Sequence, residues 1–497
     1  MGNWHVGQIV KDDIAGIKPL WTAAPVGSPA EGQPAIDAAR TDVGRLCARS
    51  VADRPTGLRI GLAQVVDAAA AAMVALMLWG VLFDTRPFLD DLGMAVGVLG
   101  ILAAWMRRQR VRTPVDVPLA VYVGLTLVSA IAHGGRLSPT IARQASIGSW
   151  PPATHAVALA VYFYGASSVL RTRRRLGVLV GILVVGVSII GIQAGADHIR
   201  HGLSDRMLDY PSVMQWSGYA GLGLLFALVL PLALAPAVVS RSVPVVLASV
   251  FVALVLALDL GNTYSRGANV CAGITYVALS LVEVRTLKSW RLITAAGVGA
   301  LCVAAALGAS VVAPRALTNF ATGRMYVSDP LVAYESRIVI WGRVVTLIRE
   351  HPGLGVGPGN YSAVMRGLYL RAGDPYDPYG ALSVAHGHST VLHLAAECGI
   401  PVAAAFLLIW WRLLTALYRV CTRTWAGVLA IGVFGALLTF FTRSLTDHFL
   451  SDLVVANRAG FLLWTLFAAA VAIARLPRLE HWPLESGRRV SLDRVRP

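Results

Sequence analysis

The sequence predicts an all-α, polytopic membrane protein with about twelve transmembrane helices and one long polar loop. The 497-residue chain is 56% hydrophobic and only 14% charged, with a mean hydropathy of +0.64, whereas a soluble domain carries about 25% charged residues. Apolar runs of about 20 residues, long enough to cross a bilayer, recur from Leu62 to Ala474. Many of the arginines behind the net charge of +16 lie in short connections between these runs. That positive-inside pattern is typical of membrane proteins and argues against nucleic acid as a partner.

Each apolar run is expected to form one membrane-spanning helix, because a backbone in lipid must satisfy its own hydrogen bonds. Polar connections separate the runs and end the helices. The expected spans cover approximately residues 62–83, 88–106, 115–132, 152–170, 176–194, 216–239, 243–260, 265–282, 292–312, 391–411, 425–441 and 456–474.

Alternate connections differ in positive charge, and this sets the orientation. One set carries 15 Lys and Arg residues, whereas the other, counted with the adjoining span edges, carries eight. The richer set is expected in the cytoplasm with both termini, so the long loop lies outside. The expected segments are a cytoplasmic stretch with little order (1–57), nine spans (58–312), the large outer loop (313–390), three spans (391–474) and a basic cytoplasmic tail (475–497).

The five cysteines indicate neither a disulfide framework nor a zinc site. They form no CxxC pair, and most lie inside or beside apolar runs, where a free buried thiol is the usual role. These residues are Cys47, Cys271, Cys302, Cys398 and Cys421.

The outer loop contains one segment with a helical pattern. Apolar residues at helical spacing in Ser336–Glu350 predict an amphipathic helix whose apolar face could rest on the membrane surface. The stretch His351–Gly353 should end this helix, and the glycine-rich run that continues to Asn360 predicts tight turns. This run is not a P-loop, because no Gly-Lys-Ser or Gly-Lys-Thr follows it.

His388 is the best candidate for chemistry, because it lies where the outer loop re-enters the membrane. An unperturbed imidazole titrates near pH 6.5. At neutral pH it can therefore accept a proton from a hydroxyl group and act as a general base. A histidine that only meets lipid headgroups is the alternative, and His386 competes for the role. A zinc site is not expected, since the next potential ligands, Glu397 and Cys398, complete no familiar spacing.

Arginines on the outer side could bind an anionic lipid-linked diphosphate. Arg266 begins an apolar run, and Arg337 lies in the amphipathic segment; a guanidinium fork at either place suits diphosphate oxygens. The alternatives are an arginine that reaches the headgroups and a solvated helix face. Further possible supporting residues, besides His386, are Arg206, Arg443 and Asp447. The last two, four residues apart, could simply form an ion pair.

In its motifs the chain resembles the O-antigen ligase and O-antigen polymerase superfamily of bacterial envelope glycosyltransferases. A Ser-Arg-Gly start to a middle span is matched by Ser265–Gly267. An Arg-x-x-x-Trp helix followed by His-Pro-x-x-Gly-x-Gly-x-Gly-Asn is matched by Arg337–Trp341 and His351–Asn360. The third motif ends the large loop: a His is followed directly by Asn, Ser or Gln and, after nine further residues, by Gly. His388, Ser389 and Gly399 match it.

This resemblance implies a GT-C-like, inverting glycosyltransferase of the bacterial inner membrane with its active site facing the periplasm. The donor would be a glycan on undecaprenyl diphosphate, and the acceptor would be lipid A–core oligosaccharide, which completes lipopolysaccharide. Family members use no metal, cofactor or nucleotide sugar. His388 would deprotonate the acceptor hydroxyl, while Arg266 and Arg337 would stabilise the charge on the leaving diphosphate.

Other functions remain open. An O-antigen polymerase or a protein O-oligosaccharyltransferase would use the same donor with another acceptor, and the family pattern, which often has Gly, Thr or Tyr where this chain has Val402, leaves the subfamily undecided. A lipid or anion transporter is the alternative from another class. Against it, no inverted repeat is visible and few charges lie well inside a span, chiefly Asp67 and Glu397.

Overall fold

The computed structural model divides the chain into two compact units, Met1–Ile60 and Gly61–Pro497. It describes residues 57–83, 89–109, 112–133, 152–200, 219–240, 242–263, 265–286, 330–362, 364–365, 386–421, 427–447 and 458–480. Only residues 57–60 of the first unit are among them, so the fold described below is that of the second unit. These residues form α-helices joined by turns and contain no β-strand.

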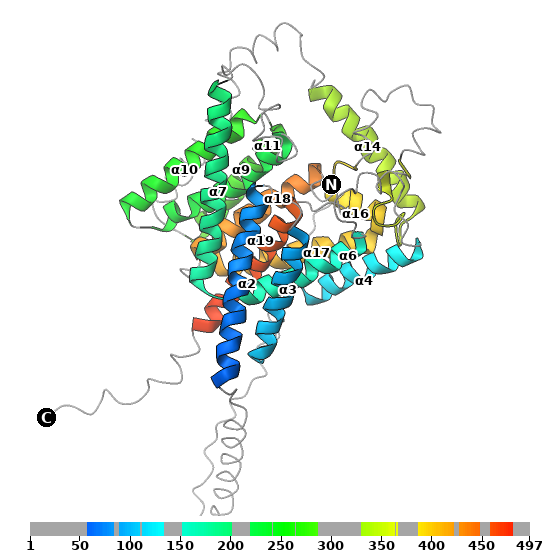
Figure 1. The fold of residues 1–497 in the computed structure, drawn as a ribbon. Helices are drawn as coiled ribbons and strands as arrows, with labels where there is room; N and C mark the ends of the chain where they lie inside the picture. Colours follow the sequence, from blue (N-terminus) through cyan, green and yellow to red (C-terminus); the bar gives the residue numbers. More distant parts are fainter. Residues whose placement is uncertain are drawn as a thin grey trace, which may run out of the picture. The chain divides into compact units, whose positions relative to one another are not determined.

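The helices occur in the order expected from the apolar runs (Figure 1). They are α2 (Gly57–Phe83), α3 (Leu89–Met106), α4 (Asp116–Ala132), α6 (Pro152–Val169), α7 (Arg173–Arg200), α9 (Tyr219–Val239), α10 (Val243–Asn262), α11 (Arg266–Thr286), α14 (Pro330–Glu350), α16 (Thr390–Cys398), α17 (Ile400–Cys421), α18 (Gly427–Thr446) and α19 (Arg458–Glu480).

Six of the described helices, α2, α7, α10, α17, α18 and α19, are long and apolar enough to cross a membrane. Shorter apolar stretches lie in α3, α4, α9 and α11. The expectation of a multi-pass, all-helical protein is therefore confirmed. The expected span 292–312 lies outside the described residues, and the count of about twelve spans stays a prediction.

Glycines let helices approach closely where no large side chain separates them. In the α3–α6 pair, a Cβ added to Gly165 would lie 2.5 Å from the Cα of Gly97, and one added to Gly100 would lie 2.6 Å from the Cα of Gly165. Close contact between small residues is a main source of helix association in a bilayer, where the hydrophobic effect gives little.

Aromatic side chains fill the centre of the bundle where α6, α17, α18 and α19 meet. Trp410 and Trp464 are almost fully buried, and the Trp410 ring packs edge-on against Phe467 with centroids 4.9 Å apart. The hydroxyls of Tyr162 and Thr465 share a hydrogen bond of 2.6 Å, whereas the buried indole N–H of Trp410 has no acceptor among the described residues. This layer supports α17 and α18, which lead to the candidate site.

The expected continuous span 391–411 is wrong, because the helix is broken between α16 and α17. Gly399 adopts a φ of 92°, and a Cβ at this position would overlap the carbonyl oxygen of Gly353. The N–H of Ile400 donates to the carbonyl of Pro352 at 2.9 Å. Chain from the preceding turn region thus occupies the break, and only glycine tolerates both the close approach and the left-handed backbone.

The glycine-rich run after α14 closes the C-terminal end of α16. The N–H of Val356 donates to the carbonyl of Ala396 (2.9 Å), and that of Gly357 donates to the carbonyl of Glu397 (2.8 Å). Ser129 of α4 donates its hydroxyl to the carbonyl of Leu354 at 2.6 Å. The predicted tight turns are present, and they satisfy helix-end carbonyls that would otherwise be unpaired.

Helix α14 begins six residues before the expected segment, at Pro330, and ends as expected at Glu350. Its buried apolar residues Ile340, Val344 and Leu347 form a small core with neighbours that include Tyr361 and Ala396. The helix packs on α16 (Figure 1). The expectation that this face rests on the membrane surface is therefore wrong, because α16 and the glycine-rich turns already cover it.

Candidate active site

His388 precedes α16 in a left-handed backbone conformation, with φ 44°. Few residues with a side chain adopt it, although Asn, Asp and His are enriched there. The next residue, Ser389, is extended and caps α16 by accepting a hydrogen bond of 3.4 Å from the N–H of Leu392. The backbone therefore fixes the point from which the imidazole leaves the chain.

Three helices hold the segment 386–390 in place. From α14, the indole N–H of Trp341 donates to the carbonyl of His388 at 3.4 Å. Directly after α18, the carbonyl of Asp447 accepts from both the N–H (3.2 Å) and the hydroxyl (3.3 Å) of Thr390. Within α16, Nδ1 of His393 accepts from the N–H of Gly387 at 3.4 Å. The histidine is thus placed by rigid elements on several sides, as a catalytic group requires.

A buried ion pair faces His388. Arg443, 3% exposed, donates through its guanidinium to Oδ2 of Asp447 at 2.6 Å. The other carboxylate oxygen, Oδ1, lies 3.6 Å from Nδ1 of His388. That separation is too long for a hydrogen bond, but it allows strong attraction once the imidazole carries a proton. Catalytic hydrogen bonds are often this long before substrate binds.

The same guanidinium packs against the start of α11. A Cβ on Gly267 would overlap the Arg443 guanidinium, so a larger residue cannot occupy this position without moving it. Helices α11 and α18 are also joined by a 2.9 Å hydrogen bond between the hydroxyls of Thr275 and Thr439. Arg443 therefore links the Ser-Arg-Gly segment to Asp447, and Asp447 links it to His388.

The two imidazoles of the His-x-His segment lie together. The rings of His386 and His388 have centroids 4.3 Å apart and planes 72° apart, an edge-to-face arrangement. His388 lies within ion-pair distance of Asp447, and this favours it as the base. No group of three or more His, Cys, Asp or Glu side chains within the described segments is arranged to hold a metal ion.

A second polar group, not recognised from the sequence, lies behind the histidine segment. Nε2 of His393 lies 3.4 Å from Oε1 of Glu397, both nearly fully buried in α16. The N–H of Tyr361 donates to the same oxygen at 3.3 Å, and its ring lies 4.6 Å from that of His393. The sequence signal was a His and a Glu four residues apart in an otherwise apolar run.

The remaining expected site residues cannot be placed at the level of side chains. Arg266 begins α11, beside Gly267, and Arg337 lies one turn before Trp341 in α14, but the structure describes only their backbone. Arg206 lies outside the described residues. Their roles remain predictions, although α11 and α14 both adjoin the elements that hold His388. The buried thiols of Cys271, Cys398 and Cys421 are free.

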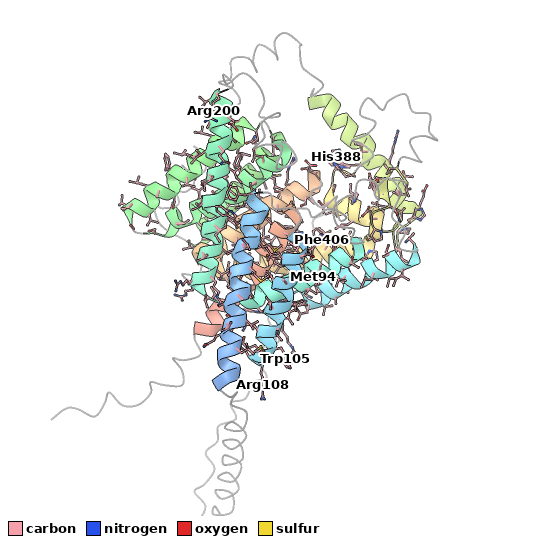
Figure 2. The ribbon with its side chains drawn as sticks, viewed as in Figure 1. Met94, Trp105, Arg108, Arg200, His388 and Phe406 are labelled. Carbon is pink, nitrogen blue, oxygen red and sulfur yellow. The ribbon has the colours of Figure 1, made fainter. Side chains whose placement is uncertain are left out.

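Figure 2 places His388 and Arg200 toward one end of the described helices, and Trp105 and Arg108 toward the other. Helix α7 runs between these ends, from Arg173 to Arg200. The histidine therefore lies toward the end of these helices opposite the arginine-rich connection that precedes α4.

These motifs fall largely within one region that other proteins share. A family model described as O-antigen ligase matches residues 250–407, which include the start of α11, α14, the glycine-rich turns and His388. Arg443 and Asp447 lie beyond this region, in and just after α18. No curated protein matches the chain. The match covers the motifs on which the resemblance rests, so residues 250–407 carry the O-antigen ligase domain and support a place in the O-antigen ligase superfamily.

Proposed function

We propose that this protein is an O-antigen ligase that transfers a glycan from undecaprenyl diphosphate to lipid A–core oligosaccharide at the periplasmic face of the inner membrane. The O-antigen ligase domain at residues 250–407 supports the coarser statement, a membrane glycosyltransferase. The observation that carries the mechanism is the buried Arg443–Asp447 pair, which presents its second carboxylate oxygen to His388.

In this reaction His388 acts as the general base. With Nδ1 facing Asp447, Nε2 of His388 accepts the proton of an acceptor hydroxyl as the oxygen attacks the anomeric carbon of the donor. The bond from that carbon to the diphosphate breaks, the configuration inverts, and undecaprenyl diphosphate leaves. Asp447 stabilises the imidazolium that forms, while Arg443 keeps the carboxylate oriented.

Arg266 and Arg337 are assigned to the diphosphate of the donor. Arg266 starts α11 beside the buried Arg443 contact, and Arg337 is on the helix whose Trp341 holds the histidine carbonyl. Positive charge in these two places would stabilise the leaving group as negative charge develops on it. Arg→Lys at either position keeps the charge but removes the two-pronged donor, so we expect a clear loss of transfer. Wild-type turnover by both variants would rule out this role.

The identity of the acceptor requires a direct assay. Purified full-length protein is incubated with an undecaprenyl-linked glycan and either lipid A–core or a second lipid-linked glycan. Transfer to lipid A–core alone supports the ligase, whereas extension of the second glycan identifies a polymerase. If neither acceptor is modified but a peptide acceptor is, the enzyme is a protein O-oligosaccharyltransferase. Binding of the donor without any transfer would favour the transporter.

The base is tested with a matched pair of variants. Asn suits the left-handed backbone of His388, so His388→Asn removes the base with little strain. A positioned general base contributes roughly 10²–10⁴ in rate, and we expect a loss of this size. His386→Asn should be much less impaired, because His388 is the histidine at the motif position and lies 3.6 Å from Asp447. The opposite result would move the base to His386 and contradict the motif alignment.

A further inference from the structure

Arginines gather around one carboxylate at the end of the bundle opposite His388. Asp67 of α2 is 4% exposed, and its Oδ2 lies 3.0 Å from the guanidinium of Arg107 and 2.6 Å from that of Arg175. Arg107 directly follows α3, beside the Arg108 that Figure 2 shows at this end. Arg175 also donates to the carbonyl of Val169 at 2.9 Å. Both guanidinium groups are therefore fixed in position.

Two further arginines leave this group with excess positive charge. Arg171, in the connection between α6 and α7, interacts electrostatically with Asp67, Arg107 and Arg175 of this group, and also with Arg475 of α19. Burial, followed by the charge of Arg107, lowers the pKa of Arg171 to about 10, with Asp67 opposing and Arg475 and Arg175 adding to the shift. Asp67 is the one carboxylate acting on Arg171 among the described residues, so the cluster carries an excess of about three charges.

One donor in this cluster lacks a partner. The N–H at Nε of Arg171 is buried and donates to no acceptor among the described residues. An unpaired buried donor on a charged group is costly, and the oxygen of an anion would satisfy it. A guanidinium also presents a planar fork of N–H donors, which matches two oxygens of a phosphate at once.

Exposed apolar side chains lie close in sequence to the cluster. Leu62 and Val65 of α2 are 55% and 66% exposed, and Trp105 of α3 is 73% exposed. All three lie within about two helical turns of Asp67 or Arg107 in sequence. Trp is enriched where a membrane helix meets the headgroups. Such a surface would contact the acyl chains of a lipid, which a free phosphate ion does not have.

We propose that Arg107, Arg171, Arg175 and Arg475 form a binding site for the phosphate of an acidic phospholipid, with its acyl chains along the exposed apolar residues of α2 and α3. Basic sites between membrane helices on the cytoplasmic side are suited to such headgroups. The site is separate from the glycan-transfer site, and its occupancy ties together α2, α3, α7 and α19. It does not depend on which acceptor the enzyme uses.

The proposal can be tested by native mass spectrometry of the purified full-length protein in detergent, with phosphatidylglycerol or phosphatidylcholine added. We expect wild type to retain phosphatidylglycerol preferentially. The variant Arg171→Gln/Arg475→Gln should retain it about tenfold less well, since a hydrogen bond to a charged group can contribute that factor or more. The matched control, Arg173→Gln/Arg174→Gln, removes two charges from exposed positions in the first turn of α7 and should bind like wild type.

Several results would overturn the proposal. Wild type could retain phosphatidylglycerol and phosphatidylcholine equally, or the cluster variant could retain phosphatidylglycerol as well as wild type does. The control variant could also lose as much phosphatidylglycerol as the cluster variant, which would indicate only non-specific charge. Displacement of the lipid by an equal concentration of inorganic phosphate would show a free-anion site instead. If the double variant does not elute as a folded protein, Arg171→Lys provides the test, because it keeps the charge and removes Nε; unchanged lipid retention by it would refute the role of Arg171.

Discussion

Replacing Asp447 with Asn tests the link between the buried ion pair and the histidine. The change removes the negative charge that faces Nδ1 of His388 but keeps the side-chain shape. It also keeps the backbone carbonyl that accepts two hydrogen bonds from Thr390. The histidine segment should therefore stay in place, and the variant isolates the effect of charge.

The size of the effect follows from the distance. Opposite unit charges 3.6 Å apart attract by about 1.2 kcal/mol in a water-like medium and by about 4.6 kcal/mol at an effective dielectric constant of 20. The side chains of His388 and Asp447 are 23% and 11% exposed, so an intermediate value applies. A loss of about 1.4–2.8 kcal/mol of transition-state stabilisation corresponds to a fall of about 10- to 100-fold in turnover.

The assay is transfer from the lipid-linked donor by four proteins: wild type, Asp447→Asn, His388→Asn and the double variant. Because Asp447 is proposed to act on the imidazolium, its replacement should have little further effect once His388 is Asn. If Asp447→Asn instead costs the same factor in both backgrounds, the carboxylate acts through Arg443 or the fold, and the reasoning is refuted. Unchanged turnover in the single variant would refute it equally.

Three other outcomes are expected. Gly267→Ala should displace the Arg443 guanidinium and lower transfer about as much as Asp447→Asn, whereas Gly273→Ala in the same helix, where a Cβ meets open space, should not. Gly399→Ala should destabilise the protein by about 1–3 kcal/mol in thermal unfolding, because of its positive φ and the close backbone; Gly342→Ala, in an open helical position, should change stability by less than about 1 kcal/mol or raise it. Reporter fusions placed between α6 and α7 and just beyond α14 should report opposite sides of the membrane; the same side for both would overturn the topology.

Much of the helical order could be read from the sequence, because the period and length of apolar runs decide which segments a bilayer accepts. The Arg443–Asp447 pair was also visible, since residues four apart share a helix face. Its contact with His388 was not, because nothing local relates two residues that are separated by three helices, α16, α17 and α18. The break at Gly399 was missed because apolar residues continue across it. The Gly-Ile-Pro order contained the signal, since Gly often follows a helix end and Pro often occupies a first turn.

The left-handed backbone at His388 has a practical consequence for capturing the reaction. In His388→Asn, Ser389 should still cap α16 and Trp341 should still reach the carbonyl, because neither contact uses the imidazole. Such a protein would bind donor and acceptor side by side but could not activate the hydroxyl. It is therefore the form in which to seek a stalled ternary complex by electron cryo-microscopy. The lipid that copurifies with it would then reveal the natural acceptor without any assumption about the product.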